Sequence, residues 1–168
     1  MGVRNGDVEI RDARAAEFAA VGALTVDVYV GEGHVNPESS YVTELADTAT
    51  RARTAEILVA VREGEVLGSV TVARPGTEFA DIARVGELEF RMLAVSKRAR
   101  GLGLGSALVG KIVEIARAEG FEAVVLTTMA TMADARRVYD RLGFVHVPER
   151  DWRTMAGSPL TVMRMSLS

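Results

Sequence analysis

The chain has 168 residues, enough for one domain with a sizeable hydrophobic core. Hydrophobic residues make up 48% of it, charged residues 26%, and the formal net charge is −3, so the composition indicates neither nucleic acid nor an anionic membrane as a partner. Because there is no cysteine, disulfides, zinc sites built on cysteine and a thiol nucleophile are excluded. Residues 1–10 lack the apolar core of a signal peptide, and no apolar run approaches the ~20 residues of a membrane span, so we expect a cytoplasmic protein with one domain over residues 1–168.

The N-terminal half predicts a strand, two helices and a hairpin. A short strand is expected at residues 8–10. Apolar residues then recur at helical spacing over residues 14–29 and again over 40–53, on either side of a segment rich in glycine that ends in proline. Two apolar runs, 57–61 and 66–72, flank a turn that contains glycine, which is typical of a β-hairpin.

The C-terminal half alternates strands and helices. The expected elements are a strand over 86–95, a helix that ends at Gly120, a buried strand over 123–126, a helix over 132–142, and two last strands near 143–147 and 160–167. Strand, loop, helix and strand from Leu88 to Leu126 form a right-handed crossover unit, so these two strands are expected to be parallel. The other strands are expected to be antiparallel, which gives a mixed α/β sheet.

The segment from Val95 to Ser106 is the most informative part of the sequence. Three alternating glycines let the backbone approach a ligand closely, because no Cβ stands in the way. Their N–H groups, the free N–H groups of the following helix and the helix dipole present donors to an anion, and three basic residues lie beside them. We therefore predict a pyrophosphate site made by Gly101, Gly103 and Gly105 together with Lys97, Arg98 and Arg100.

Two common nucleotide-binding loops fit this segment less well. A P-loop needs Gly-Lys-Ser/Thr, and the pair Gly105-Ser106 lacks the lysine. A dinucleotide fingerprint needs a third glycine where Ser106 stands and a tight loop directly after the strand. Here five residues, three of them basic, separate Val95 from Gly101.

Two motifs resemble a known family. The pattern Arg100-x-x-Gly103-x-Gly105 is similar to the acyl-CoA signature of the GCN5-related N-acetyltransferase (GNAT) superfamily, and Ala135-x-x-x-Tyr139-x-x-x-Gly143-Phe144 looks like its downstream helix and turn. The resemblance covers residues 87–144 and departs at Met132, where the family often has an asparagine that contacts the cofactor. It implies the GNAT fold, an α/β fold with a mixed, mostly antiparallel sheet of about seven strands, a central splayed parallel pair and about four flanking helices.

The resemblance also implies an activity of the bacterial, small-molecule type. An acetyl group, or a larger acyl group, would move from acetyl-CoA to a primary amine of a small molecule or a peptide, by direct attack in a ternary complex and without a metal. The pantetheine arm would pair with the open backbone where the first parallel strand ends, and the diphosphate would lie on the glycine loop. The cofactor-binding residues implied are Leu93, Ala94, Val95, Arg100, Gly101, Leu102, Gly103, Leu104, Gly105, Ser106, Met132 and Ala135.

The reaction needs two proton transfers. An alkylamine has a pKa of about 10 and is mostly protonated at neutral pH, so a base must accept its proton before it attacks. We assign this role to Glu89 acting through water, with Glu87 on the same strand face as the alternative; Arg91 could instead pair with one of these glutamates. Tyr139 matches the tyrosine with which the superfamily protonates the leaving thiolate. His34 is a further candidate for a substrate contact, because it lies in the loop before the second helix.

The identity of the acceptor has no signature in the sequence. A polyamine, an amino acid, an antibiotic and a protein N-terminus all remain open. The segment Glu149-Arg150-Asp151-Trp152 looks like that of a bacterial subgroup, and its Trp152 is expected either to pack the last hairpin or to line the acceptor side with Asp151. A homodimer is common in the superfamily, although no interface is visible in the sequence. The alternative function is a catalytically silent acyl-CoA-binding sensor or assembly module.

Overall fold

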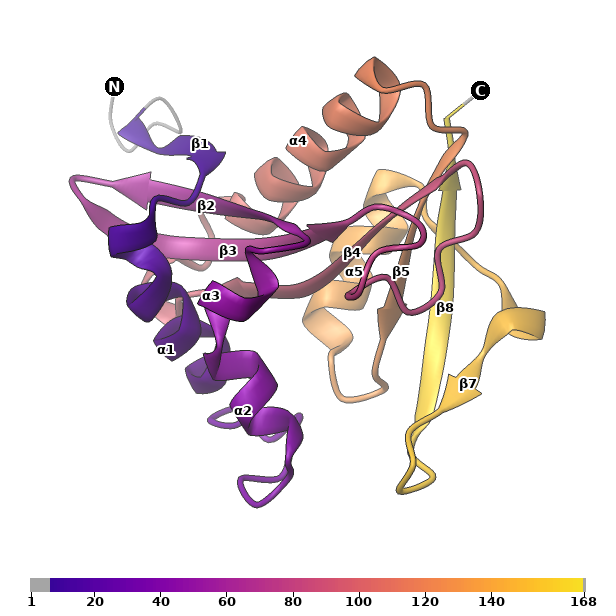
Figure 1. Ribbon diagram of the computed structural model, residues 1–168, viewed down its shortest axis with the longest axis horizontal. Helices are drawn as coiled ribbons and strands as arrows, with labels where there is room; N and C mark the ends of the chain where they lie inside the picture. The colour runs from indigo at the N-terminus through magenta and orange to yellow at the C-terminus, as the bar shows by residue number, and fades with distance from the viewer. Residues whose placement is uncertain (1–6, 168) are drawn as a thin grey trace.

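The computed structural model describes residues 7–167, and in this range eight strands form one mixed sheet flanked by helices (Figure 1). The strand order is β1-β2-β3-β4-β5-β8-β6, and β7 pairs with β8. The elements are, in chain order, β1 (Glu9–Asp12), η2 (Ala15–Glu17), α1 (Phe18–Tyr29), α2 (Tyr41–Ala46), α3 (Thr48–Arg51), β2 (Glu56–Arg62), β3 (Glu65–Ala73), β4 (Glu87–Val95), η3 (Lys97–Ala99), α4 (Leu104–Ala118), β5 (Ala123–Thr128), α5 (Ala133–Leu142), β6 (Val145–His146), η4 (Pro148–Arg150), β7 (Trp152–Arg153) and β8 (Pro159–Ser166).

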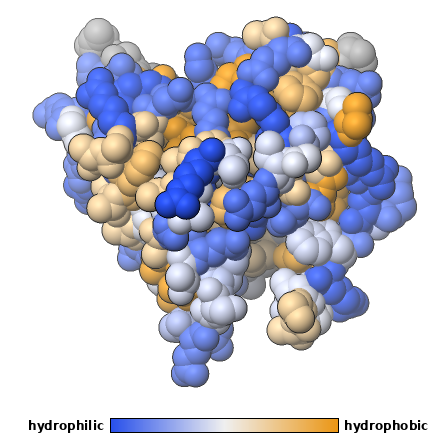
Figure 2. Space-filling view, in the orientation of Figure 1, coloured by the Kyte–Doolittle hydropathy of each residue, from blue (hydrophilic) through white to orange (hydrophobic). Residues whose placement is uncertain are grey.

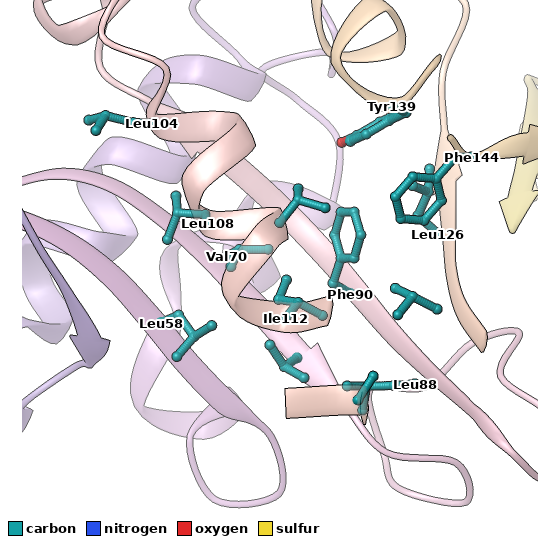
Figure 3. Packing of buried hydrophobic residues seen from close by; sticks show 14 of the residues in the cluster. Leu58, Val70, Leu88, Phe90, Leu104, Leu108, Ile112, Leu126, Tyr139 and Phe144 are labelled. Carbon is teal, nitrogen blue, oxygen red and sulfur yellow. The ribbon is translucent and has the colours of Figure 1, made fainter. Parts of the chain in front are cut away.

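The main hydrophobic core lies between the sheet and α4 with α5. Buried residues of α4 recur every three to four positions, so one stripe of the helix faces the sheet. Aromatic rings from β4, α5 and the turn before β6 meet edge to face in this core. Its fully buried members include Leu58, Leu88, Leu108, Ile112 and Leu126 (Figure 3).

A second, smaller core lies on the other face of the sheet, beneath α1 and α2. Val28 and Tyr29 of α1 and Leu45 of α2 pack there against Met92 and Ala94 of β4. The two faces of β4 therefore carry different elements. Leu88 and Phe90 face the main core, whereas Met92 and Ala94 face the smaller one, because the regular alternation of the strand is interrupted at Met92. This arrangement decides which side chains can meet near the end of β4.

The predicted α/β fold with a central parallel pair is confirmed. β4 and β5 run parallel, whereas every other pairing within the described residues is antiparallel. The described sheet has one strand more than the seven or so expected, because the two-residue strand β7 had no pattern to reveal it. No helix between residues 7 and 167 is both long and apolar enough to cross a membrane.

The single helix expected over residues 40–53 is wrong, because the chain breaks at Asp47 into α2 and α3. The Asp47 side chain accepts from the Thr50 amide at 3.1 Å and so caps the start of α3. The buried guanidinium of Arg51 donates to the Glu44 and Leu45 carbonyls at the end of α2. These contacts satisfy the polar groups that one continuous helix would have paired internally.

The parallel pair separates halfway along. Residues of β4 from Glu87 to Phe90 pair in register with β5 from Ala123 to Leu126, and the pairing stops there. A register shift between β3 and β4 lies opposite Met92, which has a φ of 58°, an uncommon value for a residue with a side chain. The bulge bends β4, so its last residues run away from β5 and leave backbone groups free of the ladder (Figure 1).

Candidate active site

The start of α4 forms a cradle of backbone donors. Gly101 and Gly103 have φ values of 91° and 75°, a conformation that favours glycine, and a Cβ added at either would meet no atom within 4 Å. The first bond of the helix ladder runs from the Ala107 amide to the Gly103 carbonyl at 3.0 Å. The amides of residues 104–106 precede that bond and point outward at the positive end of the helix dipole. This geometry suits an anion.

The cradle opens into a cavity of about 660 Å³ that is also lined by Leu93 and Val95 at the end of β4 and by Thr131 and Met132 after β5. Most of the cofactor-binding residues implied by the sequence line it. Two do not: Ala94 packs into the smaller core, and the side chain of Leu102 packs against the main core. The implied residues on the cavity wall are Leu93, Val95, Arg100, Gly101, Gly103, Leu104, Gly105, Ser106, Met132 and Ala135.

Of the three basic residues expected beside the cradle, only Arg100 lines the cavity. Its guanidinium donates to the Val95 carbonyl at 3.0 Å and to the Glu32 carboxylate at 2.6 Å. Arg98 instead forms an ion pair with Glu65 at the start of β3. The sequence placed Arg98 in the loop correctly but could not show which way its long side chain turns.

Several cavity residues were missed by the sequence. His34, which was considered only as a substrate contact, forms a 2.9 Å hydrogen bond to Thr131 and lies on the cavity wall. Glu32 has no sequence signal, because it meets Arg100 across 68 positions of the chain. Arg141 also lines the cavity, and it has no ion-pair partner within residues 7–167. Helical spacing from Ala135 could have indicated it, since residues 135, 138 and 141 share a face of α5.

Tyr139 holds its ring in the core and its hydroxyl at the edge of that core. The ring is 5% exposed and packs edge to face on Phe90 and Phe144. The hydroxyl points away from Phe144 toward α4 (Figure 3), and no residue between 7 and 167 hydrogen-bonds to it. Burial raises the pKa of Tyr139 well above its usual value, so the phenol keeps its proton at neutral pH.

Glu89 is fully buried on the opposite face of β4. Its Oε1 accepts from the Ile82 and Ala83 amides at 2.9 and 3.0 Å, whereas its Oε2 has no hydrogen-bond partner in the described part of the chain. Burial raises the pKa of Glu89, although the two amide bonds oppose that shift. A buried carboxylate with one free oxygen and a raised pKa has the properties of a general base.

The carboxylate of Glu87, the alternative base, is hydrogen-bonded to two arginine side chains and one backbone amide. Its carboxylate accepts from Arg150 through two bonds of 2.9 Å, from Arg164 at 2.9 Å and from the Arg84 amide at 3.0 Å. Burial alone would raise the pKa of Glu87, but the Arg150, Arg84 and Arg164 bonds outweigh burial and hold it at about 2. Such a carboxylate has little affinity for a proton, so the geometry favours Glu89 over Glu87.

Arg91 shares the face of Glu89 but pairs with neither glutamate of the strand. Its guanidinium donates to the Tyr41 hydroxyl at 3.0 Å and lies 3.4 Å from the Asp81 carboxylate and 3.8 Å from that of Glu44. The suggested pairing of Arg91 with Glu87 or Glu89 is therefore wrong, because α2 and the segment before β4 supply nearer partners.

The segment 149–152 borders a second, shallower cavity of about 420 Å³. Trp152 lines this cavity together with Ile82, and its indole N–H donates to the Thr127 hydroxyl at 3.3 Å where β5 ends. Asp151 binds His146 at 2.8 Å and so holds the segment to β6. In Figure 2 the corresponding face is largely hydrophilic and is hollowed between α2 and the β7–β8 hairpin.

The comparisons with known proteins agree with this geometry. Over 104 residues the chain is 34% identical to the N-acetylaspartate synthetase of Homo sapiens, a match that covers 62% of this chain and 32% of that protein. The chain thus spans about a third of the length of the N-acetylaspartate synthetases it matches.

Solved structures give the same picture over nearly the whole chain. A GCN5-related N-acetyltransferase from Kribbella flavida superposes with a TM-score of 0.72 and 25% identity, over 96% of this chain and 99% of that one. YncA from Salmonella typhimurium, solved with its cofactor acetyl-CoA, superposes with a TM-score of 0.71 and 20% identity, over 96% and 95% of the two chains.

The sequence model of the acetyltransferase (GNAT) family matches residues 22–144, a range that holds the glycine cradle, Glu89 and Tyr139. Most of the chain lies inside this match, and the resemblance seen in the two motifs is confirmed. The chain belongs to the acetyltransferase (GNAT) family.

Proposed function

We propose that this protein is an N-acetyltransferase that moves an acetyl group from acetyl-CoA to a primary amine by direct attack in a ternary complex. The observation that carries the proposal is the position of two proton-handling groups on opposite faces of β4. Glu89 faces the α1 and α2 side, whereas Tyr139 contacts Phe90 on the α4 and α5 side. Both can serve one reaction only through the gap where β4 and β5 separate.

The residues around that gap fit acetyl-CoA. The free amides at the start of α4 and the Arg100 guanidinium suit a diphosphate, and the open space at Gly101 and Gly103 leaves room for it. After Phe90, β4 still pairs with β3 but no longer with β5, so the backbone on its β5 side offers hydrogen bonds to the amides of a pantetheine arm. Bound there, acetyl-CoA supplies a thioester whose carbonyl carbon the amine can attack.

Each proton then has a defined path. Glu89 accepts a proton from the acceptor ammonium, through water, and thereby frees the nitrogen lone pair for attack on the carbonyl carbon. A backbone N–H near Leu93 stabilises the negative charge that develops on the carbonyl oxygen. When the carbon–sulfur bond breaks, Tyr139 donates its proton to the leaving thiolate. The second proton that the nitrogen loses on becoming an amide restores the Tyr139 phenol, and Glu89 returns its proton to solvent. No covalent intermediate with the protein is required.

The acceptor is proposed to enter from the face that carries Glu89 and Trp152. The second cavity lies on this face and reaches Ile82, whose amide binds Glu89. The human relative named above is a synthetase of N-acetylaspartate, so amino acids with a free α-amine are the first class of acceptor to screen. Peptides and other small-molecule amines form the second class.

The proposal is tested by measuring thiol release from acetyl-CoA over a panel of amines, with the wild type and the Glu89→Gln variant. We expect at least one amine to raise turnover in the wild type, and Glu89→Gln to lower kcat by about 10² while acetyl-CoA still binds, because only the proton acceptor is lost. Glu89→Gln keeps the shape of the side chain, and a thermal melt controls for folding.

Two outcomes would count against the proposal. If acetyl-CoA binds but no amine in the panel raises thiol release, the protein is better described as an acyl-CoA-binding sensor. If Glu89→Gln turns over as fast as the wild type, Glu89 is not the base.

A further inference from the structure

Both backbone polar groups of Ile82 are hydrogen-bonded to side chains of the acceptor face. Its N–H donates to Glu89 at 2.9 Å, and its carbonyl accepts from the Arg150 guanidinium at 2.7 Å. The Ala83 amide follows and donates to the same oxygen of Glu89 at 3.0 Å. The segment between β3 and β4, which crosses in front of β4 and β5 in Figure 1, is thus fastened directly over the proposed base.

Arg150 is itself rigidly placed. Its side chain is 8% exposed and makes two bonds of 2.9 Å to the Glu87 carboxylate, which is 6% exposed. Glu87 also accepts from the Arg84 amide, two residues beyond Ile82. A buried guanidinium that makes two hydrogen bonds to one carboxylate has little freedom to rotate. The Arg150 guanidinium is therefore held in position to donate to the Ile82 carbonyl.

We propose that Arg150 is a positioning residue for Glu89. By holding the Ile82 carbonyl, it keeps both amide donors of the segment on Oε1 and leaves Oε2 for the acceptor amine or its water. The inference rests on the proposed role of Glu89 as the base. It gives the Glu149-Arg150-Asp151-Trp152 segment, which the family motifs leave unexplained, a part in the reaction.

Release of the Ile82 segment would change the acidity of Glu89 in one definite direction. Burial raises the pKa of Glu89, the Ile82 and Ala83 amides lower it, Asp81 raises it and Arg91 lowers it. If the segment were released, the two amide bonds would weaken and the protonated form would be favoured. The pKa of Glu89 would then rise further. At a fixed pH a smaller fraction of Glu89 would be deprotonated and able to act as a base, so turnover would fall.

Other ionisable groups reach this face from the neighbouring elements. Tyr41 and Glu44 of α2 contact Arg91, whose charge in turn lowers the pKa of Glu89. From the η4 side, Arg150 itself contributes a positive charge. The most direct test is therefore a substitution that keeps the positive charge at position 150 but cannot bind Glu87 and the Ile82 carbonyl at the same time.

The experiment compares Arg150→Lys with Arg164→Lys. Both arginines bind Glu87 at 2.9 Å, but only Arg150 also binds Ile82. Carbon-13 NMR of labelled glutamate carboxyls, with Glu89→Gln to assign the signal, gives the pKa of Glu89 in each protein. We expect Arg150→Lys to raise it by about one unit and Arg164→Lys to leave it in place, because lysine cannot reproduce the fork that reaches both partners.

Turnover provides a second readout. With an amine found in the panel above, kcat of Arg150→Lys should fall several-fold near neutral pH while the KM for acetyl-CoA is unchanged. An unchanged Glu89 pKa in Arg150→Lys, or an equal rise in both lysine variants, would overturn the positioning role while leaving Glu89 as the base. Full turnover by Glu89→Gln would instead remove the base and the positioning role together.

A second pair of variants covers the case in which Arg150→Lys does not fold. Glu87→Gln alone retains the Arg150 guanidinium that donates to the Ile82 carbonyl, and the glutamine oxygen can still accept one bond from it. The double variant Glu87→Gln, Arg150→Met removes that donor and leaves no buried, unpaired charge at position 87 or 150. We expect the Glu89 pKa to rise in the double variant relative to the single one. Equal values in the two proteins would overturn the proposal.

Discussion

Individual side chains at this site owe their chemistry to their surroundings rather than to their type. Glu87 and Glu89 lie two residues apart on one face of β4, yet the pKa of Glu87 is lowered to about 2 and that of Glu89 is raised. Glu87 is bound by two arginines, whereas Glu89 meets only backbone amides and keeps a free oxygen. One strand therefore carries a structural ion-pair centre and a candidate base side by side.

The Tyr139→Phe variant tests the proposed acid at the same scale. We expect kcat to fall by about 10² with the KM for acetyl-CoA little changed, because the variant removes only the proton donor. The melting temperature should hardly move, since no described residue hydrogen-bonds to the hydroxyl and the ring contacts remain. Steady-state thiol release and a thermal melt check both points; a large loss of stability would show that the hydroxyl is structural.

At the scale of elements, the site depends on two departures from regular structure. The bulge at Met92 turns the end of β4 away from β5, and the glycine loop lets α4 begin with its amides uncovered. Both devices free backbone groups that an ordinary strand or capped helix would satisfy internally. The candidate cofactor site is thus made mainly of main chain, which explains why few side chains identify it.

Gly105→Glu tests the start of α4. Gly105 lies inside the helix, and a Cβ there would meet only the Val95 side chain at 4.0 Å, so the variant should fold. Its carboxylate would lie where the diphosphate is expected and would repel it. Calorimetry with coenzyme A should show binding lost or weakened by at least about 10² relative to the wild type. Unchanged affinity in a folded Gly105→Glu protein would exclude the cradle as the diphosphate site.

Glu32→Gln tests whether the segment after α1, which forms one wall of the larger cavity, affects coenzyme A binding. The Glu32 carboxylate holds the Arg100 guanidinium and faces the same cavity, so it competes with an incoming diphosphate. Removing its charge should strengthen coenzyme A binding by about two- to fivefold at low salt, and less at high salt. Glu38→Gln, on the same segment but away from the cavity, is the control. Weaker binding by Glu32→Gln would mean that Glu32 supports the wall instead.

At the scale of the whole molecule, the Glu87 centre joins distant parts of the chain. Arg150 comes from η4, Arg164 from β8 and the Arg84 amide from the segment before β4, all on one carboxylate of β4. It therefore connects the middle of the sheet to its C-terminal strands. Breaking a buried ion pair by removing one partner is usually costly, so this centre should matter for stability.

Stability should fall in acid for this reason. The folded pKa of Glu87 is about 2 and its ordinary value is 4.5, so its contribution is complete above pH 4.5 and is lost as the pH falls toward 2. Glu17, whose pKa the Arg11 bond also lowers to about 2, adds to the same slope. Glu87→Gln should lose roughly 3 kcal/mol at neutral pH and show a shallower decline below pH 4.5, as measured by urea unfolding. Parallel pH curves for the two proteins would contradict this role.

The sequence determined those features that rest on local patterns. Helical and strand periodicities located α4, α5 and the parallel pair, because each buries a continuous apolar face. The glycine loop and the Tyr139 block identified the family, because backbone donors before a helix and a tyrosine at a fixed spacing need no distant partner to be recognised. The break at Asp47 was missed, since Arg51 and Asp47 act through capping contacts that periodicity does not record.

Only the tertiary structure distinguishes the surroundings of the two glutamates and brings Arg150 close to them. Glu87 and Glu89 are two residues apart and point to the same face of the strand, so the local sequence pattern gives no reason to prefer one of them as the base. Their difference comes from Arg150 and Arg164, more than sixty positions away, which bind one carboxylate and leave the other free. A pKa depends on burial and on charges within a few ångströms, and the fold alone brings such distant residues together.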